Sequence, residues 1–481
     1  MSALSWLDRE HIVAKPGFSR WMVPPAALCV HLCIGQAYAF SVFNLPMTKL
    51  IGITQGAATQ AHLPISQVIA HAHSAPGDWR LTQLGWIFTL AIVFLGLSSA
   101  FTGTWLDRVG PRKAMFTAAC CFGGGFLVSA LGVHLHQLWL IYLGYGVLGG
   151  CGLGIGYISP VKTLITWFPD RPGMATGMAI MGFGGGAMIA APLSVLLMHA
   201  FSTPTHVGVA ETFVVMGVIY FCFMMVGAVM VRVPAPGWQP AGYVVPAAAR
   251  KLITVENVHV DQALRTPQFY LLWWVLCLNV TAGIGVLGQA SAMSQEMLGG
   301  RITPVAAAGF VGLLSLFNML GRFFWASTSD YIGRRNTYFV FFLLGIVLYA
   351  VVPTSAHIQS VALFVLCYLI IISMYGGGFS TIPAYLKDIF GVRYVGAIHG
   401  RLLTAWSAAG VFGPVLVNYI RQYQIDHGVA KADAYTVTMY IMAGLLFIGF
   451  LCNYFMRPVH ERHFLRVGQS EGLTGTEEAA Q

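Results

Sequence analysis

Long apolar runs separated by short polar segments make up most of the chain. Runs of about 20 residues or more recur twelve times between Trp21 and Met456, and a helix of about 20 residues crosses a hydrocarbon core of about 30 Å. Because backbone polar groups find no partner in lipid, each run is predicted to be a helix. The expected spans are Trp21–Thr48, Leu81–Leu106, Ala114–Val133, Gln137–Trp167, Gly173–Met198, Glu211–Val231, Gln268–Met297, Pro304–Ser329, Thr337–Pro353, Ser360–Lys387, Val395–Ile420 and Ala434–Met456. The pattern therefore predicts an all-α integral membrane protein with twelve transmembrane helices.

Two segments of the first half of the chain return in the second half at a constant spacing. GTWLDRVGPRK at 103–113 resembles ASTSDYIGRRN at 326–336, which places Asp107 and Asp330 223 residues apart. GYISPVKTLITWF, ending at Phe168, resembles GFSTIPAYLKDIF, ending at Phe390, at an offset of 222. Two landmarks at one spacing indicate a duplicated six-helix unit, which suits a carrier that opens alternately to either side. The expected units are an N-terminal tail at 1–20, pseudo-symmetric halves at 21–231 and 268–456, a linker at 232–267 and a C-terminal tail at 457–481.

Charged residues are few and unevenly placed. They make up 9% of the chain against 57% hydrophobic residues, and the formal net charge is +9. About nineteen Lys and Arg residues fall in the tails and in alternate loops, which the positive-inside rule assigns to the cytoplasm. We expect a multi-pass protein of the cell membrane, in bacteria the inner membrane, with both termini cytoplasmic. Because the basic residues form no single patch with interleaved aromatic residues, nucleic-acid binding is not expected.

The loop at 103–113 has the pattern Gly-x-x-x-Asp-Arg-x-Gly-x-Arg-Lys. This pattern, with its duplicate at 330–335, resembles the signature loop of the major facilitator superfamily. It places acids and bases at helix ends, where a charge cluster is expected to form and to break when the halves rock. The alternative is that the arginines only anchor the loops. The candidate gating residues are Asp107, Arg108, Arg112, Asp330 and Arg334.

Three further segments narrow the resemblance. PPAALCVHLCIGQAYAFSVF, GYISPVKTLITWFPDRPGMATGMAIMGFGGG and FGVRYVGAIHGRLLTAWSAAGVFGP look like the oxalate:formate antiporter branch, a relative of the monocarboxylate transporters. The resemblance implies a secondary transporter of small carboxylate anions, without cofactor or metal. Oxalate-carrying relatives also place a lysine on the eleventh helix, and 402–413 contains none. A monoanion such as lactate, pyruvate, formate or glycolate is therefore at least as good a candidate as a dianion.

Arg322 stands inside an apolar run, about seven residues before the run ends. One interpretation is that the side chain snorkels to the cytoplasmic boundary, roughly 10 Å away at 1.5 Å per residue. The other is a polar cavity, because Asn318 lies one turn earlier on the same face and can hydrogen-bond Arg322. A guanidinium binds a carboxylate bidentately. The resemblance also implies an arginine on the eighth helix as the substrate's counter-charge.

Other side chains are candidates for the wall of the same site. Aromatic rings exclude water around a small anion, and a phenol or indole donates one hydrogen bond. Lys162 is expected to snorkel, and His31, taken as the only mid-helix histidine, is a candidate for proton coupling. His62, His71 and His73 are expected to belong to an ordinary polar loop, 49–80, and not to a metal site. The candidate wall residues are Gln36, Tyr38, Tyr157, Tyr375 and Trp406.

The acidic residues constrain the mechanism. All 17 fall in loops, tails or helix ends, so no carboxylate is expected inside the membrane for a proton relay or an enzyme site. An empty carrier would have to enclose a bare cation, at a cost of several kcal/mol that a bound anion removes. We therefore expect anion exchange by a functional monomer, with proton symport as the alternative. A transporter-like sensor is disfavoured because the linker, about 35 residues, is shorter than a typical domain.

Overall fold

The structure is a computed structural model that describes residues 5–55, 75–203, 206–243, 252–254, 256–299, 301–302 and 304–465. Its described part is helical apart from isolated bridges. The loop histidines His62, His71 and His73 lie outside the described residues, so the expectation for them stays a prediction.

The first half of the chain, here the N-half, ends at Met230. Its helices are η1 (Ser5–Leu7), η2 (Arg9–Ile12), η3 (Arg20–Met22), α1 (Val23–Ile34), η4 (Gly35–Phe43), α2 (Asn44–Met47), α3 (Gly52–Gln55), α5 (Leu81–Val109), α6 (Pro111–His134), α7 (Leu138–Ile141), η6 (Tyr142–Gly149), α8 (Gly150–Trp167), α9 (Pro172–Phe201) and α10 (Val209–Met230).

The second half, here the C-half, begins at Pro267 and follows one short linker helix. The linker helix is α11 (Val260–Ala263), and the C-half contains α12 (Pro267–Met297), α13 (Pro304–Ile332), α14 (Arg334–His357), α15 (Val361–Phe390), α16 (Val395–Leu402), α17 (Thr404–Asp426), α18 (Thr436–Tyr454) and, in the C-terminal tail, η7 (Glu461–His463).

Twelve helical segments within the described residues are long and apolar enough to cross a membrane, which confirms the predicted number of spans. Three spans are less regular than the apolar pattern predicts. The first continues from α1 into the 3-10 helix η4, the fourth begins with the π-helix η6, and the eleventh is divided into α16 and α17 at Leu403. The first irregularity lies where α1 approaches α9 closely. A Cβ on Gly35 would lie 3.0 Å from the Cα of Gly186.

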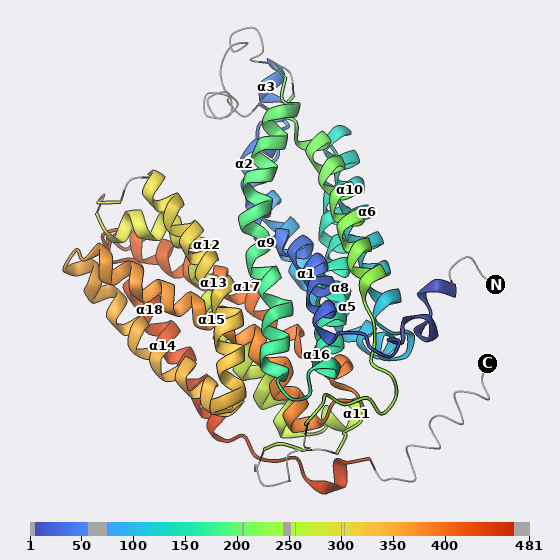
Figure 1. Cartoon of the computed structure of the whole chain (residues 1–481). Coiled ribbons are helices and arrows are strands. Elements are labelled where there is room, and N and C mark those ends of the chain that lie inside the picture. Colours follow the sequence, from blue (N-terminus) through green and yellow to red (C-terminus); the bar gives the residue numbers. More distant parts are fainter. Residues whose placement is uncertain are drawn as a thin grey trace.

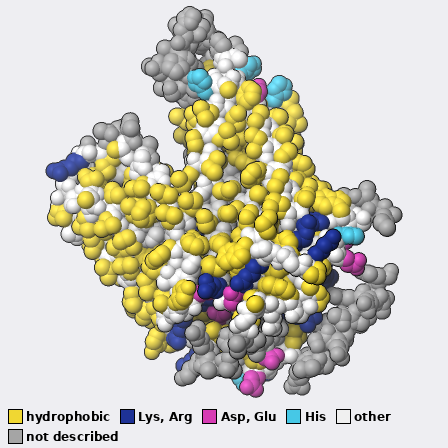
Figure 2. All heavy atoms as spheres, viewed as in Figure 1, with side chains coloured by type: hydrophobic (Ala, Val, Ile, Leu, Met, Phe, Trp, Pro, Cys, Tyr) yellow, Lys and Arg dark blue, Asp and Glu magenta, His cyan; other side chains and the backbone are white. Residues whose placement is uncertain are grey.

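The N-terminal tail, the linker and the C-terminal tail meet at one end of the bundle, here the linker end. Backbone hydrogen bonds join Ala14 to Val233 and Leu465 to Asn257, both at 2.9 Å. The two halves lie against each other at this end (Figure 1). They splay apart toward the opposite end, here the loop end, where α2 and α3 lie. Figure 2 shows a V-shaped notch open at the loop end, hydrophobic flanks, and Lys and Arg lying mainly toward the linker end.

Glycines allow the close approach of the two halves. On one side of the interface α5 packs on α16, where a Cβ on Gly103 would lie 2.8 Å from the Cα of Ala397. On the other side α9 packs on α13, where a Cβ on Gly184 would lie 3.0 Å from the Cα of Met319. Backbones can approach this closely only where no side chain intervenes. The two contacts are related by the duplication, because α5 and α13 carry the repeated loop.

Candidate functional site

Arg322 is completely buried between the two halves, at 0% exposure. Its Nε donates to Asn318 Oδ1 at 3.1 Å, as the four-residue spacing on α13 predicts. Its Nη1 lies 3.4 Å from the carbonyl oxygen of Ile180 on α9 of the N-half. Nη2 has no hydrogen-bond partner among the described residues. The side chain therefore does not snorkel to the boundary, and one of its donor groups is buried and unsatisfied.

Aromatic rings from both halves surround the guanidinium. The Arg322 Cζ lies 5.4 Å from the ring centre of Phe183 on α9 and 5.2 Å from that of Phe379 on α15. Phe379 packs on Trp406 of α17 with ring centres 4.4 Å apart, and Tyr157 of α8 lies 5.4 Å from Trp406. Such rings stabilise a cation through their faces and exclude water from it. Sequence reasoning missed both phenylalanines, although each adjoins a glycine run.

A pair of tyrosines closes this aromatic group on one side. The hydroxyls of Tyr38, on η4, and Tyr375, on α15, lie 3.0 Å apart, so the pair bridges the halves. Tyr38 is half-buried, whereas Tyr375 is buried. Tyr38 and Tyr157 are both near enough to Arg322 to interact with it electrostatically. The structure thus brings together Tyr38, Tyr157, Tyr375 and Trp406 around Arg322.

Several polar atoms in this region are buried without a hydrogen bond. Besides Arg322 Nη2 they include the Tyr157 hydroxyl and the Trp406 Nε1. Both can donate a hydrogen bond, and a buried donor without an acceptor costs about 1–3 kcal/mol. An anion would supply acceptors to all three groups. The side-chain oxygen of Gln36 accepts from the Tyr145 hydroxyl at 2.8 Å within the N-half, and its Nε2 is another buried atom without a partner among the described residues.

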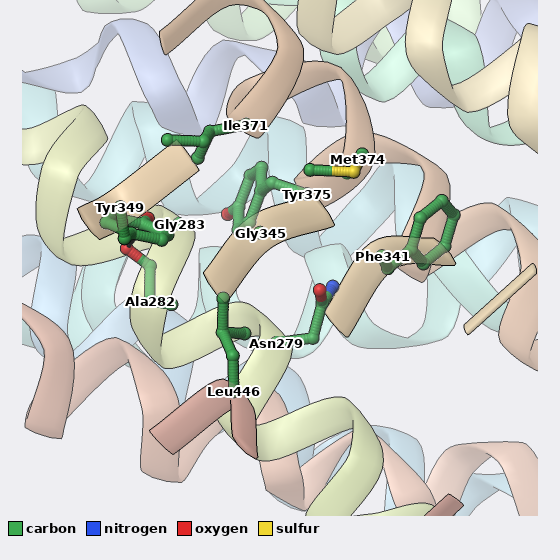
Figure 3. Close-up of a pocket in the computed structure, with 10 residues that line it drawn as sticks. All are labelled: Asn279, Ala282, Gly283, Phe341, Gly345, Tyr349, Ile371, Met374, Tyr375 and Leu446. Atoms are coloured by element: carbon green, nitrogen blue, oxygen red, sulfur yellow. Dashed lines mark hydrogen bonds between the residues drawn. The ribbon is translucent and has the colours of Figure 1, made fainter. Parts of the chain in front are cut away.

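A separate small pocket lies within the C-half behind Tyr375 (Figure 3). It has a volume of about 10 Å³ and is walled by α12, α14, α15 and α18. A space of this size holds about one water molecule. Its lining includes Asn279, Tyr349 and Tyr375 and no charged residue. The pocket therefore lacks the counter-charge that an anion requires.

Asp330, at the linker end of α13, binds the start of α9 across the interface. Its carboxylate accepts from the backbone N–H groups of Gly173 at 2.9 Å and Met174 at 2.8 Å. Arg334 donates to the same carboxylate at 2.5 Å and lies 3.4 Å from Asp388. The first N–H groups of a helix have no partner inside the helix and favour an anion. This contact holds the halves together at the linker end.

Asp107 occupies the related position on α5. Its carboxylate forms an ion pair with Lys162 of α8 and interacts with the backbone N–H of Ala397 in the first turn of α16. Lys162 is partly exposed, and its ammonium group is paired with Asp107 in the last turn of α5, a partner that the snorkelling expectation did not include. The contact between its ammonium group and Asp107 depends on how α5 and α8 pack, which the sequence pattern does not specify.

The other two candidate gating arginines differ in burial. Arg112 is buried in the N-half, where its guanidinium donates to the carbonyl oxygens of Ala228, Val229 and Val231 at the end of α10. A cation is stabilised there by the unpaired carbonyl groups of a helix C-terminus. Arg108 is exposed at the end of α5.

Two buried histidines face Tyr157 from opposite halves. The ring of His31 on α1 lies 5.5 Å from the Tyr157 ring, and the ring of His399 on α16 lies 5.9 Å from it. Both histidines are buried. The expectation that His31 is the only mid-helix histidine is therefore wrong. The sequence context of His399 gives no sign that this side chain faces the first half.

Comparisons with known proteins agree with this architecture. The family model described as Major Facilitator Superfamily matches residues 27–414. The oxalate:formate antiporter of Oxalobacter formigenes is 29% identical over 398 residues, which cover 82% of this chain and 83% of that protein. Apicoplast pyruvate carrier 1 of Toxoplasma gondii is 23% identical, covering 82% of each chain. Monocarboxylate transporter 11 of Homo sapiens is 28% identical over 36% of this chain and 35% of that protein.

Solved structures show the same fold at low sequence identity. The transporter FucP, crystallised in the outward conformation, aligns with a TM-score of 0.60 at 13% identity, covering 91% of this chain and 99% of that chain. The proton:xylose symporter XylE aligns with a TM-score of 0.61 at 13% identity, covering 90% and 95%. With twelve spans in two related halves and a family match over most of its length, the chain is a non-enzymatic membrane transporter that belongs to the Major Facilitator Superfamily.

Proposed function

We propose that this transporter exchanges small carboxylate anions and that Arg322 is their counter-charge. The observation that carries the proposal is the position of Arg322, which is fully buried between the halves with one amino group unpaired. A carboxylate accepts two parallel hydrogen bonds from a guanidinium, so it matches this donor. The printed names of the relatives, an oxalate:formate antiporter and a pyruvate carrier, support the same substrate class.

The single cation favours a monoanion over a dianion. Among the described residues, the polar groups gathered around Arg322 are phenols, an indole, an amide and imidazoles, and none is a second fixed cation. One guanidinium neutralises one carboxylate. The second carboxylate of a dianion would lie against aromatic rings, where desolvation of its charge has no compensation. Formate, lactate, pyruvate and glycolate are the substrates that we expect to bind best.

Exchange follows from the cost of enclosing Arg322 without an anion. When both ends of the site are closed, a bare guanidinium away from water costs several kcal/mol, and a bound carboxylate removes much of that cost. Loaded carriers therefore change conformation readily, whereas empty carriers do so slowly. Net transport would require the empty carrier to return, so this site favours antiport over uniport.

The linker-end contacts fit the role of a gate. Asp330 of α13 contacts the first turn of α9, and Asp107 of α5 contacts the first turn of α16, so both carboxylates hold the halves together. Opening of the linker end must break both contacts, while the notch at the loop end closes. We propose that the linker end faces the cytoplasm, as the distribution of Lys and Arg suggests, and that one chain is sufficient for function.

The proposal is tested with purified protein in vesicles preloaded with unlabelled carboxylate. Wild-type protein should accumulate external labelled formate, lactate or pyruvate by counterflow, and Arg322→Ala should abolish it. Arg322→Lys keeps the charge and loses the planar fork, so a weaker affinity with residual counterflow is expected. Arg462→Ala, an exposed arginine of the C-terminal tail, serves as the matched control and should behave as wild type.

Three results would refute or replace parts of the proposal. Wild-type counterflow in Arg322→Ala would refute the role of the arginine. Carboxylate binding without counterflow in wild type would favour a sensor. Proton entry in step with carboxylate, at one proton per anion, would replace exchange by proton symport, the alternative in which His31 is the candidate proton carrier.

A further inference from the structure

The contact between the halves near the linker end contains two imidazoles. His31 belongs to the N-half and His399 to the C-half, and Tyr157 lies between their rings. The two rings are near enough to act on each other electrostatically. His399 is two residues beyond Ala397, the residue at which Asp107 interacts with α16. This histidine is thus part of the surface that separates when the linker end opens.

While the halves are closed, the surroundings of both imidazole rings disfavour the protonated form. The Nδ1 of His31 lies 3.2 Å from the carbonyl oxygen of Ala27, and the Nε2 of His31 and of His399 have no hydrogen-bond partner among the described residues. An imidazolium donates from both nitrogens, so a charged His399 would be a buried donor without an acceptor at Nε2. His31 has backbone carbonyl groups of Ala27 and Tyr157 beside it, but it is also fully buried. Arg322 is also close enough to repel a charge on His31.

The described acids at the linker ends of α5 and α15 already have cationic partners, although one carboxylate oxygen of Asp107 accepts no hydrogen bond among the described residues. Asp107 is paired with Lys162, and Asp388 lies 3.4 Å from Arg334. The positive charges of Lys162 and Arg401 both interact electrostatically with the carboxylate of Asp107. The charged or titratable groups described toward the linker end of the elements packed on α16 are Asp107 and Arg108 on α5, Tyr157 and Lys162 on α8, Asp261 on α11, Tyr270 on α12, and Tyr385, Lys387 and Asp388 on α15, with Arg401 on α16 itself.

We propose that His31 and His399 form a proton-sensitive contact, in which protonation of either ring opens the linker end of the transporter. In the closed contact an imidazolium is buried, and the acids described nearby already have cationic partners, whereas separation of the halves exposes both rings to solvent. An ordinary imidazole titrates near pH 6.5, so the effect falls in a range that cells reach. For its physiological meaning the inference rests on the proposed function: acid would favour loading and release of carboxylate at the linker end.

The size of the effect follows from linkage. If opening takes up one proton, the ratio of open to closed carriers rises by up to about tenfold for each unit of decrease in pH within the titration range. Loss of one histidine should reduce this slope, and loss of both should remove it. The dependence concerns the conformation itself and does not require a bound anion.

The experiment is hydrogen–deuterium exchange of the full chain in lipid nanodiscs without carboxylate, at pH 7.5 and 5.5. Rates are corrected for the intrinsic pH dependence of amide exchange. Amides of α16 (Val395–Leu402) should exchange faster at pH 5.5 in wild type. His399→Gln and His31→Gln, which cannot be protonated, should each lose much of this acceleration, and the double variant all of it. The control is His134→Gln, because His134 is exposed at the far end of α6.

Three outcomes of the exchange experiment would refute the proton-sensitive contact. Acceleration that persists in the double variant, that is absent from wild type, or that is equally lost in His134→Gln would overturn the proposal. Should one single variant fail to yield monodisperse protein, the other single variant decides by the same criterion. Carboxylate counterflow by wild type is measured separately. Its absence would refute the proposed function without changing the exchange result, and a flat pH response with intact counterflow would refute only the proton-sensitive contact.

Discussion

The contact between Asp330 and the start of α9 offers the most direct test of how the halves are held together. The carboxylate accepts two backbone N–H groups of the opposite half, at 2.9 and 2.8 Å. Asp330→Asn keeps the shape of the side chain, one acceptor oxygen and no charge. The closed linker end should therefore be weakened while the fold of each half is retained.

The magnitude can be worked from these contacts. Asn can still accept one N–H, so about one hydrogen bond to a charged group is lost, worth about 1.5–3 kcal/mol. The favourable interaction of the negative charge with the helix N-terminus, about 0.3–1 kcal/mol, is lost as well. The sum is about 2–4 kcal/mol. Since 1.36 kcal/mol corresponds to a factor of ten, the open population should rise about thirtyfold to several hundredfold.

The assay is deuterium exchange of the first turn of α9 at a single pH, compared between wild type and Asp330→Asn. The amides of Gly173 and Met174 should lose protection, and those of α16 should follow because both contacts break in one movement. Asp426→Asn is the matched control, because Asp426 is exposed and bonds only Gln422 among the hydrogen bonds described. Unchanged protection of the α9 amides in Asp330→Asn would refute the idea that this carboxylate holds the gate.

Two further substitutions test the packing and the tyrosine pair. Gly103→Ala would place a Cβ 2.8 Å from the Cα of Ala397, so it should force α16 away from α5 and accelerate amide exchange in α16. The control is Gly444→Ala, whose Cβ meets open space and should leave the exchange unchanged. Equal exchange in both variants would contradict the packing argument. Tyr38→Phe removes the 3.0 Å hydrogen bond to Tyr375, which is worth about 0.5–1.5 kcal/mol. The initial rate of entry of subsaturating carboxylate from the loop end should therefore be about two- to tenfold faster. An unchanged initial rate would show that the tyrosine pair does not limit access.

Much of the fold was predictable because it depends on local and repeated features. The number of spans follows from run length, since the membrane requires about 20 apolar residues for each crossing. The duplication follows from the matched loops at Asp107 and Asp330. The hydrogen bond between Asn318 and Arg322 follows from the helical repeat alone, because residues four apart lie on one face. None of these features depends on which helices become neighbours.

The site was predictable only in part. Gln36, Tyr38, Tyr157, Tyr375 and Trp406 were expected in the wall from residue type. The ring contacts of Arg322 with Phe183 and Phe379 were not expected. A phenylalanine in an apolar helix carries no sign of what it faces. The rotation of each helix about its axis decides that, and in membrane proteins small differences in packing fix this rotation.

The sequence by itself determined that the chain crosses the membrane twelve times, that it consists of two related halves, and that one arginine stands within an apolar run. Only the tertiary structure decided which groups meet across the interface: Asp330 at the start of α9, Lys162 beside Asp107, and His399 opposite His31. The physical reason is the separation along the chain between the residues that interact. Helix formation and membrane insertion are set by neighbouring residues, whereas contacts between the halves join positions that only the packing of whole helices brings together.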